Sequence, residues 1–335
     1  CLCCPLYVEK RKTAMRRIKK CTVFLLLLCL LLNLAGCAAA QKPLRVTLVL
    51  KTVTEVAEFW GTLLSGVEKA AEEYGVELKV LTSPREIDID KQIELIRQVT
   101  ADKPDVMILS AADYDRCAEA TEEAIAAGIG VVAIDTDVNA AGRACFVGSN
   151  SYEIGLEMGR AMASYLPEGG KVAVIQHMLT TTTGIERTRG VLDALNEAGN
   201  IEILGSFCCD NSTEQAQTIT TELLSADPEI RGFVCTNEVC NVGAANALVE
   251  LGMGGRVYVV GCDNSQRQIQ FLEQNIIQAI VTQRPFNMGY VAVQQAVRVA
   301  NGEQTDDFVE VSCVLITREN MYTQENQKLL FPVLR

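Results

Sequence analysis

The chain has 335 residues, of which 49% are hydrophobic and 21% are charged, and its formal net charge is −12. This length suits about two domains, and the apolar content is high enough to exclude a disordered chain. The acidic balance argues against a nucleic-acid-binding protein, because such proteins need basic surfaces to neutralise phosphates.

The first element in chain order is a secretory signal. From Met15 the basic segment MRRIKK precedes an apolar run at residues 21–32, and LAGC follows at residues 34–37. This order is typical of a signal peptide, and the apolar run is too short for a comfortable membrane span. Residues 1–14 show no such pattern, so we leave them out of the fold.

The LAGC ending resembles a bacterial lipobox. The resemblance implies cleavage before Cys37 and lipidation of its thiol and amine, which would anchor the protein on the extracytoplasmic face of the cell membrane through a tether at residues 37–43. An ordinary signal peptide or a short membrane anchor is the alternative. Residues 1–36 hold seven basic residues and one acidic residue, so the mature chain would keep 23 basic and 41 acidic residues, a net charge of −18.

The remaining cysteines show no CxxC pair and no zinc-ligand spacing. Several lie inside apolar runs, which favours small buried thiols in strands, although a disulfide among them stays open. They are Cys117, Cys145, Cys208, Cys209, Cys235, Cys240, Cys262 and Cys313.

From residue 44 onward, short apolar runs alternate with amphipathic segments of helical period. We predict strands at residues 44–50, 76–81, 105–110, 131–135, 171–176, 201–207, 232–236, 257–263 and 278–283. Near-continuous apolar strands that alternate with helices form parallel sheets covered on both faces. A single barrel is the alternative, but residues 145–155 interrupt the alternation after four units and a fresh series starts at Lys171. The sequence therefore predicts an α/β fold with two doubly wound parallel-sheet lobes.

Polar and aromatic side chains recur just past the ends of these strands, where ligands bind in open α/β sheets. Carboxylates and amides accept hydrogen bonds from hydroxyls, arginine donates, and an aromatic face packs on the C–H side of a sugar ring. Each residue alone has a plainer interpretation: Asp263 and Asn237 could be helix N-caps, and Phe59 and Trp60 could be core. Together they predict a cleft for a polyhydroxylated ligand, lined by Phe59, Trp60, Asp135, Asp137, Arg187, Asn237, Asp263 and Gln283.

Six motifs carry a resemblance to a known family: EEAIAAGIGVVAIDTD, FVGSNSYEIGLEMGRAMASYL, ERTRGVLDAL, VCTNEVCNVGAANAL, VVGCDNS and IVTQRPFNMGYVAV. Over about residues 44–325 the chain resembles ribose-type periplasmic sugar-binding proteins, which are type I substrate-binding proteins of ABC importers. The resemblance implies a hinge with crossovers near residues 149, 284 and 311. The N-terminal lobe would then comprise residues 44–149 and 284–311, and the C-terminal lobe residues 150–283 and 312–335.

The resemblance also implies roles for the cleft residues. Asp135 would accept from two sugar hydroxyls and Arg187 would donate to a ring or hydroxyl oxygen, whereas Asp137 is expected in the crossover loop. The remaining matches to the family's ligand-binding positions are Asn237, Asp263, Gln283 and the aromatic pair Phe59 and Trp60.

The chain departs from the family pattern at three places. Thr136 stands where ribose binders carry an arginine, Ala57-Glu58 replaces the usual Asn-Pro, and the aromatic of the C-terminal lobe falls near Asn211. The ligand thus stays open among a sugar, a cyclitol and a sugar-like signal.

The function implied by the resemblance is capture of a sugar or polyol by hinge closure and delivery to an ABC permease. The chain has no Walker motif, so the ATPase would be a separate chain. We expect a monomer that needs no cofactor or metal and binds no nucleic acid.

Two rival functions stay open. A lipoprotein of this kind could present its ligand to a membrane receptor or kinase as a sensor subunit. A secreted carbohydrate-active enzyme is more remote, because His177 is the only histidine, no G-x-S-x-G or H-E-x-x-H motif occurs, and no acid partner is evident for Asp135 and Asp137. A repressor is excluded because a signal peptide stands where its DNA-binding helices would be.

Overall fold

The computed structural model describes residues 42–52 and 58–331. The predicted signal peptide and the lipidation site at Cys37 lie outside the described residues. The described residues from Leu44 onward form one compact unit. Among the helices described, none combines the length and the apolar character needed to cross a bilayer.

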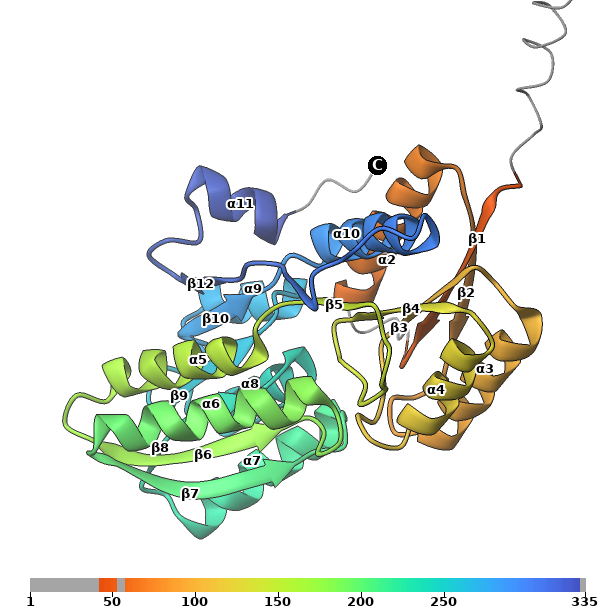
Figure 1. Cartoon of the computed structure of the whole chain (residues 1–335). Helices are drawn as coiled ribbons and strands as arrows, with labels where there is room; N and C mark the ends of the chain where they lie inside the picture. Colours follow the sequence, from red (N-terminus) through yellow and green to blue (C-terminus); the bar gives the residue numbers. More distant parts are fainter. Residues whose placement is uncertain (1–41, 53–57, 332–335) are drawn as a thin grey trace, which may run out of the picture. The chain divides into compact units, whose positions relative to one another are not determined.

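The first lobe of this unit is built on a six-stranded sheet with the order β11-β5-β4-β3-β1-β2 (Figure 1). All its pairings are parallel. Its strands are β1 (Leu44–Leu50), β2 (Val76–Thr82), β3 (Val106–Leu109), β4 (Gly130–Ile134), β5 (Cys145–Gly148) and β11 (Phe308–Glu310). Its helices are α2 (Glu58–Tyr74), α3 (Ile89–Asp102), α4 (Ala118–Ala126) and α10 (Pro285–Ala300).

The second lobe repeats this plan with the order β12-β10-β9-β8-β6-β7. Its one antiparallel pairing among the described strands joins β10 to β12. Its strands are β6 (Gly170–Gln176), β7 (Ile201–Cys208), β8 (Ile230–Cys235), β9 (Tyr258–Cys262), β10 (Ala279–Thr282) and β12 (Val314–Thr317). Its helices are α5 (Ser151–Tyr165), α6 (Thr182–Ala198), α7 (Thr213–Ala226), α8 (Glu238–Glu250), α9 (Gln266–Glu273) and α11 (Gln324–Leu330).

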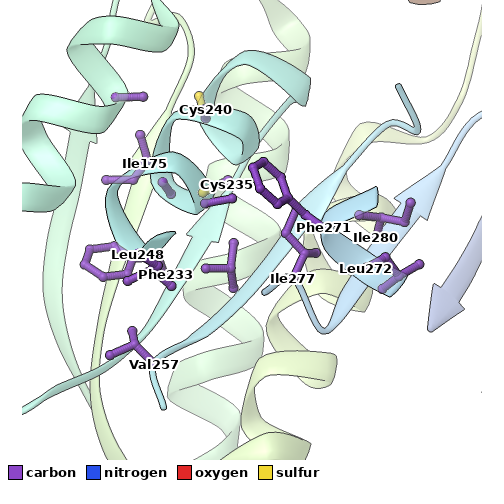
Figure 2. Packing of buried hydrophobic residues seen from close by; sticks show 14 of the residues in the cluster. Ile175, Phe233, Cys235, Cys240, Leu248, Val257, Phe271, Leu272, Ile277 and Ile280 are labelled. Carbon is purple, nitrogen blue, oxygen red and sulfur yellow. The ribbon is translucent and has the colours of Figure 1, made fainter. Parts of the chain in front are cut away.

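Each sheet is covered on both faces, as its apolar strands require. In the first lobe, α2 and α10 pack into one buried cluster and α3 and α4 into another. In the second lobe, α5 and α6 cover one face, and α7, α8, α9 and α11 contribute to the core on the other. Figure 2 shows part of that second core, where Phe233 and Phe271 are fully buried among aliphatic side chains such as Leu248.

The structure confirms the predicted fold class and contains a strand at each of the nine predicted places. The interpretation of residues 145–155 as a simple interruption is wrong, because residues 145–148 form β5. Three strands escaped the sequence analysis, namely β5, β11 and β12, and each has only three or four residues. Such short segments carry too little periodicity to be recognised.

The described cysteines after Cys37 are all free thiols. Most are buried, as expected, but Cys117, Cys209, Cys240 and Cys313 lie outside strands. The Sγ atoms of Cys209 and Cys240 are 3.4 Å apart. These thiols fill space in the core, and burial raises the pKa of Cys117 to about 11, so that it stays protonated at neutral pH.

Glycines allow the helices next to the cleft to pack closely. Helix α10 lies beside α2, although the two are far apart in sequence (Figure 1). A Cβ atom on Gly66 of α2 would come 2.0 Å from the carbonyl oxygen of Phe286, and one on Gly289 of α10 would come 2.1 Å from that of Leu63. Because backbone cannot yield as a side chain tip does, both positions need glycine.

We predict that Gly66→Ala destabilises the protein by about 1–3 kcal/mol, since overpacking would force α2 and α10 apart. The matched control is Gly61→Ala in the same helix, where a Cβ meets nothing within 4 Å. That change should stabilise the protein by about 0.5–1 kcal/mol through helix propensity. Urea unfolding measures both, and equal effects of the two substitutions would contradict the close crossing.

Candidate functional site

A cavity between the two lobes collects polar side chains from the carboxyl ends of both sheets. Its empty volume, including the open space at its mouth, is about 480 Å³. Seven of the eight residues in the predicted site line it, namely Phe59, Trp60, Asp135, Arg187, Asn237, Asp263 and Gln283. The other lining residues are Lys51, Thr52, Glu86, His177, Thr183, Asn211, Glu238 and Val239.

Lys51, the residue after β1, forms a buried ion-paired cluster on the floor of this cavity. Its Nζ lies 2.8 Å from Glu86 Oε1 and 3.4 Å from Asp135 Oδ2, and all three side chains are at most 6% exposed. Burial opposes the charge on Lys51, but the two carboxylates outweigh burial and raise the pKa of its ammonium group. Lys51 is therefore charged in the closed cleft and neutralises part of the acid around it.

The two lobes present equivalent aspartates. Asp135 follows β4 and Asp263 follows β9, strands that hold the same place in the two sheets. Both have positive φ angles, 63° and 75°, which are rare for residues other than glycine. The backbone N–H of each donates across to the next strand, to Val147 and Val281 respectively. This strained turn aims each carboxylate into the cavity, a form of strain that clusters at functional sites.

Arg187 in the first turns of α6 supplies a buried guanidinium group. It is 3% exposed, and its Nη1 donates to the carbonyl oxygen of Thr236 at 2.8 Å. Its Nε has no hydrogen-bond partner in the protein. Since a buried donor without a partner is costly, this atom is suited to a ligand oxygen.

A chain of hydrogen bonds crosses the cleft. Asn237 Nδ2 donates to Asn211 Oδ1 at 2.8 Å, and Asn211 Nδ2 donates to Glu86 Oε2 at 2.7 Å. Asn237 is at the same time the N-cap of α8, where its Oδ1 accepts from the N–H of Cys240. The N-cap interpretation of Asn237 is thus confirmed, and its amide group still reaches the cavity. Asp263 is no N-cap, because Ser265 caps α9.

His177 lies where the second sheet places its counterpart of Lys51, just after β6. Its Nδ1 is 2.7 Å from Thr236 Oγ1 and its Nε2 is 3.3 Å from Thr183 Oγ1. Burial, with added repulsion from Lys51 and Arg187, holds the pKa of His177 well below its usual value. The imidazole is therefore neutral at pH 7 and exchanges hydrogen bonds without adding charge.

Glu238 places a fourth carboxylate on the wall of the cavity. It is 6% exposed, and its backbone N–H donates to Asp263 Oδ2 at 3.0 Å. Burial, reinforced by the negative charge of Asp263, raises the pKa of Glu238 to about 8. Glu238 thus keeps its proton in the empty cleft at neutral pH.

Phe59 and Trp60 form the aromatic side of the cavity. Their rings meet edge to face, with centroids 5.1 Å apart, and Lys51 Nζ lies 5.6 Å from the centre of the Trp60 ring. Trp60 is buried and Phe59 is only half-buried. The pair could pack on the apolar face of a ring-shaped ligand.

Asp137 lies outside the cavity. Arg143 pairs with it at 2.7 Å, and its backbone N–H donates to Thr182 Oγ1 at 3.0 Å. Burial raises the pKa of Asp137, and Arg143 opposes that effect. The structure therefore places Asp137 at a contact between the lobes, in the loop that follows Asp135.

The predicted site did not include Lys51, Glu86, His177, Asn211 or Glu238, which all line the cavity. Lys51 and His177 directly follow the predicted strands at 44–50 and 171–176. The expectation that side chains just past strand ends bind the ligand, which we call the strand-end rule, therefore applied to them as well as to Asp135. Glu86 belongs to a loop several residues past β2, where spacing gives no signal. In addition, no three His, Cys, Asp or Glu side chains in the described part of the chain are grouped as a metal site.

Comparison with known proteins identifies the family. The model of the periplasmic binding protein domain matches residues 47–304, which is most of the chain. The chain belongs to the periplasmic binding protein family. This assignment confirms the resemblance seen in the motifs, and two lobes with a polar cleft between them fit it.

Matches between this periplasmic binding protein and individual relatives extend over nearly the whole length of those relatives. The D-allose-binding periplasmic protein of Escherichia coli is 25% identical over 303 residues, covering 86% of this chain and 96% of the relative. The D-ribose/D-allose-binding protein of Pseudomonas aeruginosa is 26% identical and covers 83% of this chain and 89% of the relative. These relatives are binding proteins rather than enzymes.

Solved structures support the same architecture. A sugar transporter from Clostridium phytofermentans is 29% identical, with a TM-score of 0.75, and covers 81% of this chain and 98% of that one. A carbohydrate-transporter solute-binding protein from Agrobacterium radiobacter, solved with D-arabinose, has a TM-score of 0.83 at 23% identity and covers 87% and 100% of the two chains. The latter match supports the fold of this periplasmic binding protein.

We predict that Lys51→Met destabilises this periplasmic binding protein by about 3–5 kcal/mol, because it leaves Glu86 and Asp135 buried without their cation. The control is Lys79→Met, which breaks the exposed pair between Lys79 and Asp102 and should cost less than about 1 kcal/mol. Urea unfolding at pH 7 measures both. A Lys51→Met loss as small as that of the control would contradict the buried cluster.

We predict a pH dependence of stability that Glu238 causes. Between the pKa of an unfolded glutamate, about 4.5, and the folded value of about 8, only the unfolded state ionises, so stability falls as pH rises. Glu238→Gln should remove this slope and be more stable than the unaltered protein at pH 8. Thermal unfolding from pH 5 to 8 tests it, with the exposed Glu222→Gln as control. Parallel curves for Glu238→Gln and the unaltered protein would contradict the raised pKa.

Proposed function

We propose that the protein captures a sugar or sugar-like polyol between its two lobes and delivers it to an ABC permease. The observation that carries the proposal is the convergence of buried donors and acceptors from both sheets on one cavity. Arg187 and Asn237 can donate to ligand oxygens, and Asp135 and Asp263 can accept from hydroxyls. The relatives named for D-allose and D-ribose support the same ligand class.

Hinge closure would create this binding site. Contacts between the lobes already surround the cavity: Asn211 donates to Glu86, Thr180 Oγ1 donates to the Ala112 carbonyl at 3.0 Å, and the N–H of Tyr114 donates to the Thr180 carbonyl. These bonds exist only when the lobes meet. A ligand that bridges both lobes adds contacts to that state alone and shifts the population toward it.

The proposal also covers how the protein is anchored and which chains it works with. In the proposal, Cys37 carries the lipid, residues 37–43 tether a monomer to the extracytoplasmic face, and a separate ATPase chain drives the permease. The lobes would move as residues 44–149 with 284–311 and residues 150–283 with 312–335. Relatives that include ribose import binding proteins favour transport over the two alternatives, a sensor subunit and a carbohydrate-active enzyme.

We predict that Arg187→Ala abolishes the thermal stabilisation that a bound sugar gives. A ligand at 100 times its Kd stabilises the folded state by about 2.7 kcal/mol. A thermal-shift screen over pentoses, hexoses and cyclitols finds such a ligand, and the shift is then measured relative to each variant's own melting temperature.

Arg189→Ala is the matched control, because Arg189 lies two residues further along α6, 58% exposed, and pairs with Glu186. This variant should keep the full shift. An undiminished shift in Arg187→Ala would reject the cavity as the ligand site, and the absence of any stabilising sugar would count against the proposed function itself.

A further inference from the structure

The charges that line the cleft do not balance. Two side chains are permanent cations, Lys51 and Arg187, and His177 is neutral. Against them stand four carboxyl groups, those of Glu86, Asp135, Asp263 and Glu238, of which Glu238 is protonated at neutral pH. Lys51 is held between Glu86 and Asp135, so its charge is already matched on that side of the cavity.

The acidic groups without an ion-pair partner are Asp263 and Glu238, and Glu238 is protonated at neutral pH. Both carboxylates are at least nine-tenths buried, and the Glu238 N–H to Asp263 Oδ2 bond keeps the two residues together. Asp263 Oδ1 accepts from the neutral amide of Gln283 at 2.9 Å. Among the described residues, no Lys, Arg or His nitrogen comes within 4.0 Å of either carboxylate. The Arg187 guanidinium attracts Asp263 from beyond ion-pair distance, but neither acidic group has a direct ion-pair partner in the described part of the protein.

The rest of the cavity points to hydroxyls on the same ligand. Arg187 Nε and Thr52 Oγ1 are buried polar atoms without partners, and both residues line the cavity. Arg187 Nε requires an acceptor oxygen, and Thr52 Oγ1 can donate to or accept from a hydroxyl. The ligand that satisfies all of these groups carries both oxygens and a positive charge.

We propose that the ligand is an amino sugar or an aminated polyol whose ammonium group lies between Glu238 and Asp263. This inference rests on the proposed function, because it names the kind of sugar that the same cleft takes. The ammonium group is the charge that the protein itself does not supply there, and its N–H donors fit carboxylate oxygens that no cation occupies.

Proton release accompanies such binding. In the empty cleft burial and Asp263 keep Glu238 protonated at pH 7, Glu58 adds to the repulsion, and the Ser265 hydroxyl opposes it. An ammonium group next to Glu238 favours the carboxylate, so the carboxyl proton passes to the buffer as the ion pair forms. A neutral sugar would instead accept a hydrogen bond from protonated Glu238, with no proton released.

The test is isothermal titration of the purified protein with pairs of ligands that differ in one group: 2-amino-, 3-amino- and 6-amino-deoxyhexoses, their hydroxyl parents and their N-acetyl derivatives. We expect one amine to bind at least about tenfold more tightly than its parent at pH 7, since a charged pair adds more than a neutral hydrogen bond. N-acetylation should abolish this gain. Titration in buffers of different ionisation enthalpy should show proton release with the amine alone.

Glu238→Gln should reduce affinity for the amine by about tenfold or more and change affinity for the parent by less than about threefold. Glu250→Gln is the control, because it removes an exposed carboxylate at the far end of the same helix. The inference would be overturned if the hydroxyl parent sugars bound as tightly as every amine. It would also be overturned if Glu238→Gln changed the affinity for amines and for parent sugars equally. Either result would leave sugar binding itself intact. Failure of amines and parents alike to bind would count against the proposed function as well as the inference.

Discussion

The buried cluster of Lys51, Glu86 and Asp135 is the constraint on which the cleft depends. Three charges are held at the carboxyl ends of the first sheet with almost no solvent, and each is tolerable only while the others stay in place. Glu86 also accepts from Asn211 of the opposite lobe, so the cluster connects the ion pairs to the closed arrangement of the lobes. The same carboxylate thus contributes to the stability of one lobe and to its contact with the other.

The two lobes place side chains at the cleft with the same framework of strands, but the charges of those side chains differ. Strands in equivalent positions end in Asp135 and Asp263, both forced into the left-handed region, whereas the equivalent ends of β1 and β6 carry a charged lysine and a neutral histidine. Asp135 is therefore in direct ion-pair contact with Lys51, whereas Asp263 has no direct ion pair and is attracted by Arg187 only from farther away. A duplicated framework with unequal charges makes a cleft with two distinct ends, which can orient a ligand that is itself asymmetric.

Most of the fold follows from the sequence because long apolar strands and amphipathic helices repeat with clear periods, and the strand-end rule located Asp135, Arg187 and Asp263. What escaped it was set by contacts distant in sequence. Strand β11 pairs with β5, which lies more than 150 residues earlier in the sequence, whereas β5 also pairs with the nearby β4. Glu86 enters the site through a loop, and Asn211 gains its importance only from Asn237 and Glu86 on other elements. Residues close in sequence can also part: Asp135 lines the cavity, whereas Asp137, two residues later, is paired with Arg143 outside it.

Thr136 shows why the family does not decide the ligand. Its hydroxyl donates to the Ala111 carbonyl at 2.7 Å inside the first lobe and is fully buried, so it cannot take the place of a cleft arginine. Lys51 provides a cation from a different strand, but it approaches Asp135 as a compact ammonium that also binds Glu86, rather than as a planar fork of donors. Part of the acceptor capacity of Asp135 is thereby used by the protein itself. The other lobe contributes two further acidic groups to the cavity, Glu238 and Asp263, neither of which has a direct ion pair, and specificity must therefore be sought at these residues as well.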